Sequence, residues 1–246
     1  MTWPDEGAAA PYKLLSVIVP VYNERNTVGE ILRRMRQVEL SIEREIIVVD
    51  DGSEDGTDKV LAALEDSTVR VVTHPANRGK GAAVRTGIAT ARGDLVLIQD
   101  ADLEYDPNDW PRLVAPLLQG RTKVVYGSRY IGEREAVSLG RWIGDRALAL
   151  LTDVLFNVTL SDVETGYKVI DRAVLDGLDL RSDRFEFEPE ITAKLLRSGQ
   201  RIFEVAVSWA GRRGDEGRKF TWRDGLRAAW TILRLRVRSD TGGERG

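Results

Sequence analysis

The sequence predicts an α/β protein with a mostly parallel sheet flanked by helices. Short apolar runs alternate with segments of helical length through the first half of the chain. This alternation favours right-handed strand–helix–strand crossovers. Polar residues collect where the apolar runs end, and ligands of such sheets bind beyond the carboxyl ends of the strands. The two observations together predict a ligand site along one edge of the sheet.

The first half contains five apolar runs of strand length, without a helical stripe. We expect these strands at residues 14–20, 45–50, 69–73, 95–98 and 123–127. Thr27 is a suitable cap for a helix that runs to about Gln37. The other helices of this half are expected to follow the turn at residues 51–56, to run from residues 77–81 to about Ala91, and to cover residues 108–119.

The second half is less regular. We expect helices at residues 139–157, 188–198 and 222–238, a short strand or turn at 164–170, and an alternating strand at 201–209. Residues 211–219 are charged and rich in glycine, and this loop is long enough to act as a lid.

Three carboxylates follow the fourth expected strand at every second position, namely Asp100, Asp102 and Glu104. Alternate side chains of an extended chain point to the same side, so we expect these groups to lie together. Like charges this close repel one another unless a cation lies among them. Oxygen ligands suit Mg²⁺ or Mn²⁺, which commonly bind together with phosphates. The alternative is an ordinary solvated acidic turn that Pro107 ends.

The composition is that of an ordinary globular protein. The 246 residues are 42% hydrophobic and 30% charged, which suits one large domain or two small ones. The net charge of −3 gives no basic field that would indicate a nucleic-acid partner. Cysteine is absent, which excludes disulfides and thiolate metal sites. With no signal-peptide pattern and no apolar window of membrane-spanning length, we expect a cytoplasmic protein, with attachment to the cytoplasmic face of a membrane as an alternative.

Four motifs occur in an order and spacing that resemble the family-two glycosyltransferases of the GT-A fold. They are residues 18–24 (IVPVYNE), 48–53 (VVDDGS), 77–81 (NRGKG) and 100–102 (DAD). Each motif alone is weak, whereas the ordered set is specific. Within the family, residues 127–129 (GSR) and 164–168 (ETGYK) resemble the dolichyl- or polyprenyl-phosphate mannose and glucose synthases.

The resemblance implies a single GT-A catalytic domain, Rossmann-like in its sheet, over residues 14–238. Residues 14–130 would form the nucleotide-sugar half, and residues 131–238 the acceptor half with an amphipathic C-terminal helix. Residues 1–13 and 239–246 are expected to be flexible tails. The implied reaction is inverting and metal-dependent, and it moves a hexose, mannose favoured, from a GDP- or UDP-hexose to a polyprenyl phosphate. Mg²⁺ or Mn²⁺ is the implied cofactor.

The resemblance also implies a role for each donor-side residue. Asp100 and Asp102 match the DxD motif that binds a metal–diphosphate, with Asp102 expected to be essential for catalysis and Glu104 a third group beside the metal. Lys80 begins a helix, where free N–H groups and the helix dipole favour an anion. The remaining donor-side residues are expected to be Pro20, Tyr22 and Glu24 at the nucleoside, Asp51 at a base N–H, and Arg218 and Lys219 of the charged loop at the diphosphate. The alternatives are solvated charges for Lys80, Arg218 and Lys219.

On the acceptor side, Arg129 and Arg141 would bind the lipid phosphate bidentately, with Arg129 also counted as catalytic. Arg141 is the looser match, and an ordinary surface arginine is the alternative. A phosphate acceptor is already ionised at pH 7, because the second pKa of a phosphate ester is about 6. A hydroxyl acceptor would need a base instead, for which Glu164 or Asp162 is the candidate.

The last expected helix carries Leu226, Trp230, Leu233 and Val237 at helical spacing among arginines. Such a helix suits an anionic membrane surface, and the alternative is a helix packed on the domain with its arginines in water. A membrane partner protein is another way to reach the lipid. The only histidine, His74, lacks companions for a metal site, and we expect it to be structural or exposed. Two further hypotheses remain, namely a glycosyltransferase for a soluble or glycan hydroxyl and an inactive nucleotide-sugar-binding module.

Overall fold

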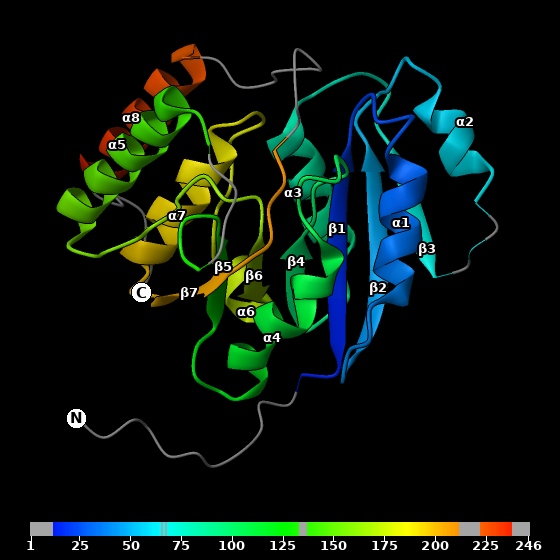
Figure 1. The fold of residues 1–246 in the computed structure, drawn as a ribbon, viewed down its shortest axis with the longest axis horizontal. Coiled ribbons are helices and arrows are strands. Elements are labelled where there is room, and N and C mark those ends of the chain that lie inside the picture. Colours follow the sequence, from blue (N-terminus) through cyan, green and yellow to red (C-terminus); the bar gives the residue numbers. More distant parts are fainter. Residues whose placement is uncertain (1–11, 65, 67, 133–136, 212–221, 238–246) are drawn as a thin grey trace, which may run out of the picture.

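One mixed sheet of seven strands organises the part of the chain that the computed structural model describes, which is residues 12–64, 66, 68–132, 137–211 and 222–237. The strands are β1 (Leu14–Val21), β2 (Glu43–Asp50), β3 (Val69–Thr73), β4 (Leu95–Ile98), β5 (Val124–Ser128), β6 (Lys168–Asp171) and β7 (Ile202–Ala206). Their order across the sheet is β3-β2-β1-β4-β6-β5-β7 (Figure 1). β6 pairs antiparallel with β4 and β5, and the other pairs are parallel. The predicted mostly parallel sheet is therefore confirmed.

The helices follow the predicted order with shifts of a few residues at their ends. They are α1 (Val28–Gln37), α2 (Thr57–Ala62), α3 (Lys80–Thr90), α4 (Trp110–Leu118), α5 (Leu139–Phe156), α6 (Arg172–Asp176), α7 (Phe187–Arg197) and α8 (Trp222–Val237). The short α6 was not predicted, because five residues are too few to give a hydrophobic period. The start of the helix predicted at residues 108–119 is the separate 3-10 turn η1 (Pro107–Asp109).

Two apolar clusters cover the two faces of the sheet. Alternate residues of β1 belong to different clusters, because side chains of a strand point to opposite faces. Val17 packs in the cluster that holds Ile31 of α1 and Leu113 of α4. Ile18 packs in the cluster that holds Ala83 of α3 and Ile191 of α7. The sheet is therefore buried on both sides, as parallel sheets require.

Helices α5 and α8 form an outer pair beyond α7 (Figure 1). Leu148 of α5 packs with Ala228 and Ile232 of α8 in a small separate cluster. Within the described residues, no helix combines the length and apolar character needed to cross a bilayer.

The described body begins two residues before the predicted domain boundary. The Tyr12 hydroxyl donates to Asp171 Oδ2 at 2.6 Å, and the Lys13 amide donates to Asp94 Oδ2 at 2.7 Å. These residues were assigned to the N-terminal tail, but both are tied to the sheet. Residues 1–11 and 239–246, which are the rest of the predicted tails, fall outside the described part.

Candidate active site

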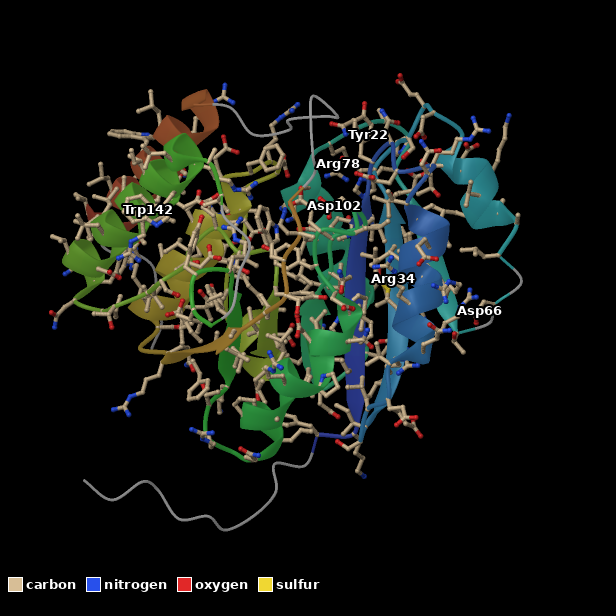
Figure 2. All side chains as sticks on the ribbon, viewed as in Figure 1. Tyr22, Arg34, Asp66, Arg78, Asp102 and Trp142 are labelled. Atoms are coloured by element: carbon tan, nitrogen blue, oxygen red, sulfur yellow. The ribbon has the colours of Figure 1, made fainter. Side chains whose placement is uncertain are left out.

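The carboxyl ends of β1, β2 and β4 lie side by side at one edge of the sheet, since these three strands are parallel neighbours. Polar residues follow each strand at this edge, as the sequence predicts. Figure 2 shows Tyr22, Arg78 and Asp102 gathered at this end of the molecule. Pro20 and Tyr22, expected at the nucleoside, are half-buried at the end of β1.

Glu24 is buried and held in place by the start of the first two helices. Its Oε2 accepts a hydrogen bond of 2.7 Å from the Thr27 hydroxyl, and its amide donates to Thr57 Oγ1 at 3.0 Å. Thr27 was expected to cap α1 with its side chain, but it makes no such bond and orients Glu24 instead. The carboxylate of Glu24 therefore has one defined position at the sheet edge.

Asp51 organises the turn that leads into α3. Its two carboxylate oxygens accept hydrogen bonds from the His74 ring, the Asn77 side chain and the amides of Arg78 and Gly79, at 2.7 to 3.0 Å. An ionised carboxylate has about four acceptor positions, so these bonds occupy it. A hydrogen bond to a nucleobase, the role expected for Asp51, would have to replace one of them. His74 is buried and structural here, as predicted.

Lys80, the first residue of α3, lies between two carboxylates. Its Nζ is 2.8 Å from Asp100 Oδ1 and 3.1 Å from Glu188 Oε1. Burial lowers the pKa of Lys80, but the charges of Asp100 and Glu188 outweigh burial, and the net shift is upward. Gly79 precedes it with φ +107°, and a Cβ there would overlap the Asp183 carbonyl. The glycine thus lets the helix start approach the segment before α7.

A buried ion pair that sequence reasoning missed extends this cluster. Lys168 is fully buried in β6, and its ammonium donates to Glu188 and to the carbonyl of Thr165. Glu188 therefore joins Lys80 and Lys168. Lys168 was quoted only as part of a motif, because in a short strand nothing in the sequence distinguishes a buried lysine from an exposed one. These contacts place Glu188 in the same charge cluster.

The acidic stretch does not continue β4 as an extended chain, so the reason given for its three carboxylates lying together was wrong. Residues 101–104 bend, and Leu103 has φ +64°. Asp102 Oδ1 accepts the Glu104 amide at 3.1 Å, whereas Glu104 Oε2 accepts Trp209 Nε1 at 3.1 Å. Among the described residues no group of three histidine, cysteine, aspartate or glutamate side chains is arranged to hold a metal. The predicted three-carboxylate site is therefore not formed by the protein alone.

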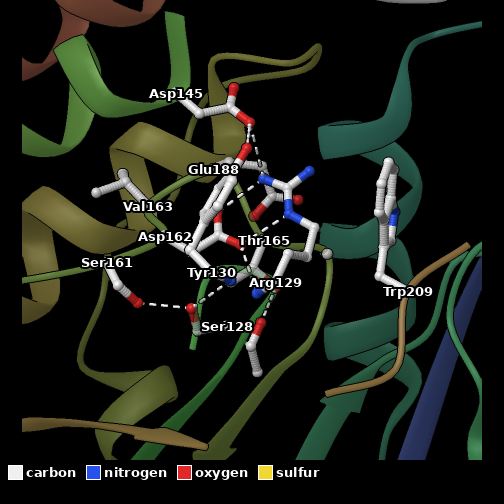
Figure 3. A network of polar contacts seen from close by, with 12 residues as sticks. Ser128, Arg129, Tyr130, Asp145, Ser161, Asp162, Val163, Thr165, Glu188 and Trp209 are labelled. Carbon is white, nitrogen blue, oxygen red and sulfur yellow. Dashed lines mark hydrogen bonds and ion pairs between the residues drawn. The ribbon is translucent and has the colours of Figure 1, made fainter. Parts of the chain in front are cut away.

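Arg129 lies in a second cluster of charges, next to the first (Figure 3). It is buried, and its Nε and Nη2 donate to the two oxygens of Asp162, both at 2.7 Å. Asp145 of α5 lies 3.5 Å from Nη2 and also accepts the Tyr130 hydroxyl. The bidentate edge of Arg129, expected to bind a phosphate, is thus paired with Asp162 in this structure. The carboxylate partners were missed because they lie 16 and 33 positions away in the sequence.

Arg141, the weaker sequence match, has the more accessible guanidinium. Its side chain is 39% exposed, and its Nε lies 3.8 Å from Asp145 Oδ2. The guanidinium stacks over the ring of Trp209 at 4.5 Å. Trp209 also hydrogen-bonds Glu104, so it connects the acidic stretch with the arginine cluster. Arg218 and Lys219 lie outside the described residues.

Glu164 lies between the two clusters. Its Oε1 is buried without a hydrogen-bond partner among the described residues. Burial and the charge of Glu188 raise its pKa to about 8, although Lys168 and Arg129 oppose the shift. Glu164 is therefore mostly protonated at pH 7. Asp162, the other candidate base, is buried and accepts three hydrogen bonds from Arg129.

Comparison with known proteins shows which family and which fold this chain is similar to. The sequence profile of the family described as "Glycosyl transferase family 2" matches residues 16–178. Two curated relatives are each an "undecaprenyl-phosphate 4-deoxy-4-formamido-L-arabinose transferase". The one from Pseudomonas fluorescens is 33% identical over 83% of this chain and 60% of its own length. The one from Aeromonas hydrophila is 32% identical over 84% of this chain and 63% of its own length. The chain thus spans about three fifths of the length of these relatives.

Among solved structures, glucosyl-3-phosphoglycerate synthase from Mycobacterium tuberculosis superimposes with a TM-score of 0.72. The sequences are 25% identical, and the match covers 96% of this chain and 85% of that one.

Proposed function

The chain belongs to glycosyl transferase family 2 and has the GT-A fold, and from this premise we propose that it transfers a sugar from a nucleotide diphosphate to the phosphate of a polyprenyl lipid. The names of the two relatives support an undecaprenyl-phosphate-like acceptor. The family and the positions of the donor-side residues at one sheet edge support a nucleotide-sugar donor.

The observation that carries this proposal is that two charge clusters adjoin at residues 164–168. Gly166 lies against Asp100 of the first cluster, and Lys168 pairs with Glu188 there. The positive charge of Arg129 in the second cluster acts to lower the pKa of Glu164. A donor diphosphate beside Lys80 and an acceptor phosphate beside Arg141 would therefore be close neighbours.

A divalent cation fits the donor side. Asp100 and Asp102 offer hard carboxylate oxygens, and Mg²⁺ or Mn²⁺ commonly completes its shell with waters and substrate phosphates, so a third protein carboxylate is not required. When bound, the cation would neutralise charge on the departing diphosphate. Lys80 provides a fixed positive charge at the same place, at the N-terminus of α3.

The state of the two candidate bases favours a phosphate acceptor over a hydroxyl acceptor. A hydroxyl must lose its proton during attack, yet Asp162 is occupied by Arg129 and Glu164 is mostly protonated at pH 7. A lipid phosphate needs no base, because its second pKa is about 6. Arg141 orients this phosphate. A phosphate oxygen attacks the anomeric carbon from the side opposite the departing nucleoside diphosphate, so the configuration at that carbon is inverted.

The sugar and the base are the finer parts of the proposal. The family resemblance favours mannose from a GDP- or UDP-hexose, whereas the two relatives are named for a 4-deoxy-4-formamido-L-arabinose. A direct test incubates the protein and Mn²⁺ with labelled GDP-mannose, UDP-glucose and the UDP-formamidoarabinose, each with undecaprenyl phosphate. Label should enter the lipid phase with one of them.

The second candidate function is transfer to a soluble acceptor, favoured by the likeness to glucosyl-3-phosphoglycerate synthase. The same assay with 3-phosphoglycerate in place of the lipid separates the two. Label only on the soluble acceptor would replace the lipid proposal, and donor binding without turnover would indicate an inactive binding module.

Variants test the individual roles. Asp102→Asn should abolish transfer while leaving the fold intact, and full activity would remove Asp102 from the metal site. Arg141→Ala should raise the KM for the lipid phosphate at least about tenfold, the loss of one charge-assisted phosphate contact. Arg129→Ala should lower the free energy of unfolding, because it leaves the carboxylate of Asp162 buried without its guanidinium partner. Unchanged kinetics in Arg141→Ala would remove it from the acceptor site.

A further inference from the structure

The outer helix pair exposes an unusual amount of apolar surface. Ten large hydrophobic side chains are exposed in the described part of the chain, and nine of them belong to α5 and α8. The tenth is Val71 of β3. Exposed apolar side chains that gather on one part of a protein surface commonly mark an interaction site.

On α8 the exposed apolar residues form one straight stripe. Leu226, Trp230, Leu233 and Val237 recur at intervals of three and four residues, and they are 38 to 82% exposed. The buried residues Ala228, Ile232 and Leu235 lie on the opposite side of the helix. The helix does pack on the domain, as the predicted alternative states, but it does so through these buried residues. The exposed stripe does not take part in that packing.

Helix α5 repeats the arrangement. Leu139, Ile143, Leu150 and Val154 fall on one side of the helix and are 52 to 73% exposed, with Trp142 at 40% beside them. Buried Leu148, Ala149 and Thr152 occupy the other side. Both helices are thus apolar on two faces, one inside the protein and one outside.

The charges around the stripes are positive. Arg146 on α5 and Arg227, Arg234 and Arg236 on α8 are exposed. The described acidic side chains of these two helices, Asp145 and Asp153, are hydrogen-bonded inside the protein, to Tyr130 and to the Leu160 amide. Among the side chains that the structure describes, this surface is therefore basic, although the whole chain carries a net charge of −3.

We propose that the exposed face of α5 and α8 docks on an anionic lipid bilayer, with Trp142 and Trp230 in the interface. Amphipathic helices with tryptophan and leucine on one side and arginine beside them bind such surfaces. A second copy of the chain fits less well, because the described side chains of two such faces would bring arginines together without exposed carboxylates to pair with them.

The position of α5 links this face to the candidate site. Arg141, which stacks on Trp209, directly precedes Trp142 in the first turns of α5. Asp145, on the same helix, contacts Arg129. Arg141 and Asp145 share the side of α5 that carries buried Leu148. A bilayer along the opposite, exposed side would therefore lie about one helix diameter, roughly 10 Å, from the two arginines. The inference deepens the proposed function and rests on it for this last step only.

The test measures binding without any reaction. The protein is sedimented with vesicles of phosphatidylcholine alone and of equal parts phosphatidylcholine and phosphatidylglycerol, with no donor and no polyprenyl phosphate. We expect the wild type to sediment with the anionic vesicles and to be released by high salt. The double variant Leu226→Ser/Trp230→Ser should need at least about tenfold more lipid. The matched control Val71→Ser removes an exposed apolar side chain elsewhere and should sediment like the wild type.

Other outcomes overturn the proposal. Equal binding to both vesicle types, or no binding to either, excludes an anionic bilayer as the occupant. A concentration-dependent dimer that the double variant loses would assign the face to a second copy. Thermal melts show whether the variant is folded, and activity on a short, water-soluble prenyl phosphate separates the two proposals. Vesicle binding without transfer would support membrane docking and contradict the proposed function. Transfer without vesicle binding would support the proposed function and contradict membrane docking.

Discussion

Gly166 shows how a single residue makes room for the candidate site. A Cβ at this position would overlap Asp100 Oδ2 and lie 3.0 Å from the ring of Tyr105. Only glycine therefore allows β6 and its preceding turn to approach the end of β4 this closely. The space is used for the ion pair between Asp100 and Lys80.

The variant Gly166→Ala should displace the Asp100 carboxylate and weaken that pair. We expect kcat/KM to fall at least about tenfold, which corresponds to about 1.4 kcal/mol of transition-state stabilisation. Steady-state kinetics with varied donor measure the effect. Gly144→Ala is the control, since nothing lies within 4 Å of a Cβ there. Equal kinetics in both variants would show that Asp100 does not depend on this space.

Glu164 should make stability depend on pH. Its pKa rises from 4.5 when unfolded to about 8 in the folded protein. The folded state therefore binds more protons between these values. The contribution of Glu164 to the free energy of unfolding is present in full below pH 4.5 and is lost as the pH rises to about 8. The loss is a few kcal/mol at most, at about 1.4 kcal/mol for each pKa unit.

Replacing Glu164 with glutamine removes this titration. Urea unfolding at pH 5 to 8 should show Glu164→Gln gaining stability relative to the wild type as the pH rises. The exposed Glu39→Gln should follow the wild type at every pH. Parallel curves for Glu164→Gln and the wild type would mean that the carboxyl is ionised in the folded protein.

At the scale of the element, α3 depends on the turn that precedes it. Asp51 holds residues 77–79 by three hydrogen bonds, and the turn brings Lys80 to the first position of the helix. The sequence motif at residues 77–81 identifies a helix start suited to an anion, but the residue that shapes it, Asp51, directly follows β2. Parallel strands bring these two segments together at the sheet edge.

Asp51→Asn should loosen this turn. The amide group of asparagine meets N–H donors on one side, so at least one charged hydrogen bond is lost at a cost of about 2 kcal/mol. We expect a lower free energy of unfolding and a higher KM for the donor. Asp58→Asn, an exposed change on α2, is the control. An unchanged donor KM would separate the turn from donor binding.

At the scale of the whole molecule, Glu188 connects the two halves. It lies on α7, yet it pairs with Lys80 at the start of α3 and with Lys168 on β6. The central charge cluster is therefore built from both predicted halves, residues 14–130 and residues 131–238.

Breaking this connection should be costly. Glu188→Gln leaves the ammonium of Lys168 buried without its anion, and we expect a loss of about 3 to 5 kcal/mol in urea unfolding. Adding Lys168→Met should restore much of that loss, since removing both charges removes the buried unpaired one. A double variant no more stable than Glu188→Gln alone would show that the pair is not what stabilises this region.

The sequence by itself determined the class of the fold, the order of its main elements and the motifs at the strand ends. Hydrophobic periodicity and motif spacing are local properties, so they can be recognised without the structure. The tertiary structure decided which charges meet. It paired Arg129 with Asp162, left Arg141 exposed, joined Lys80 to Glu188, and bent the chain after β4 where an extended strand was expected. These contacts join residues far apart in the chain, and burial sets their pKa values and partners, which no local pattern records.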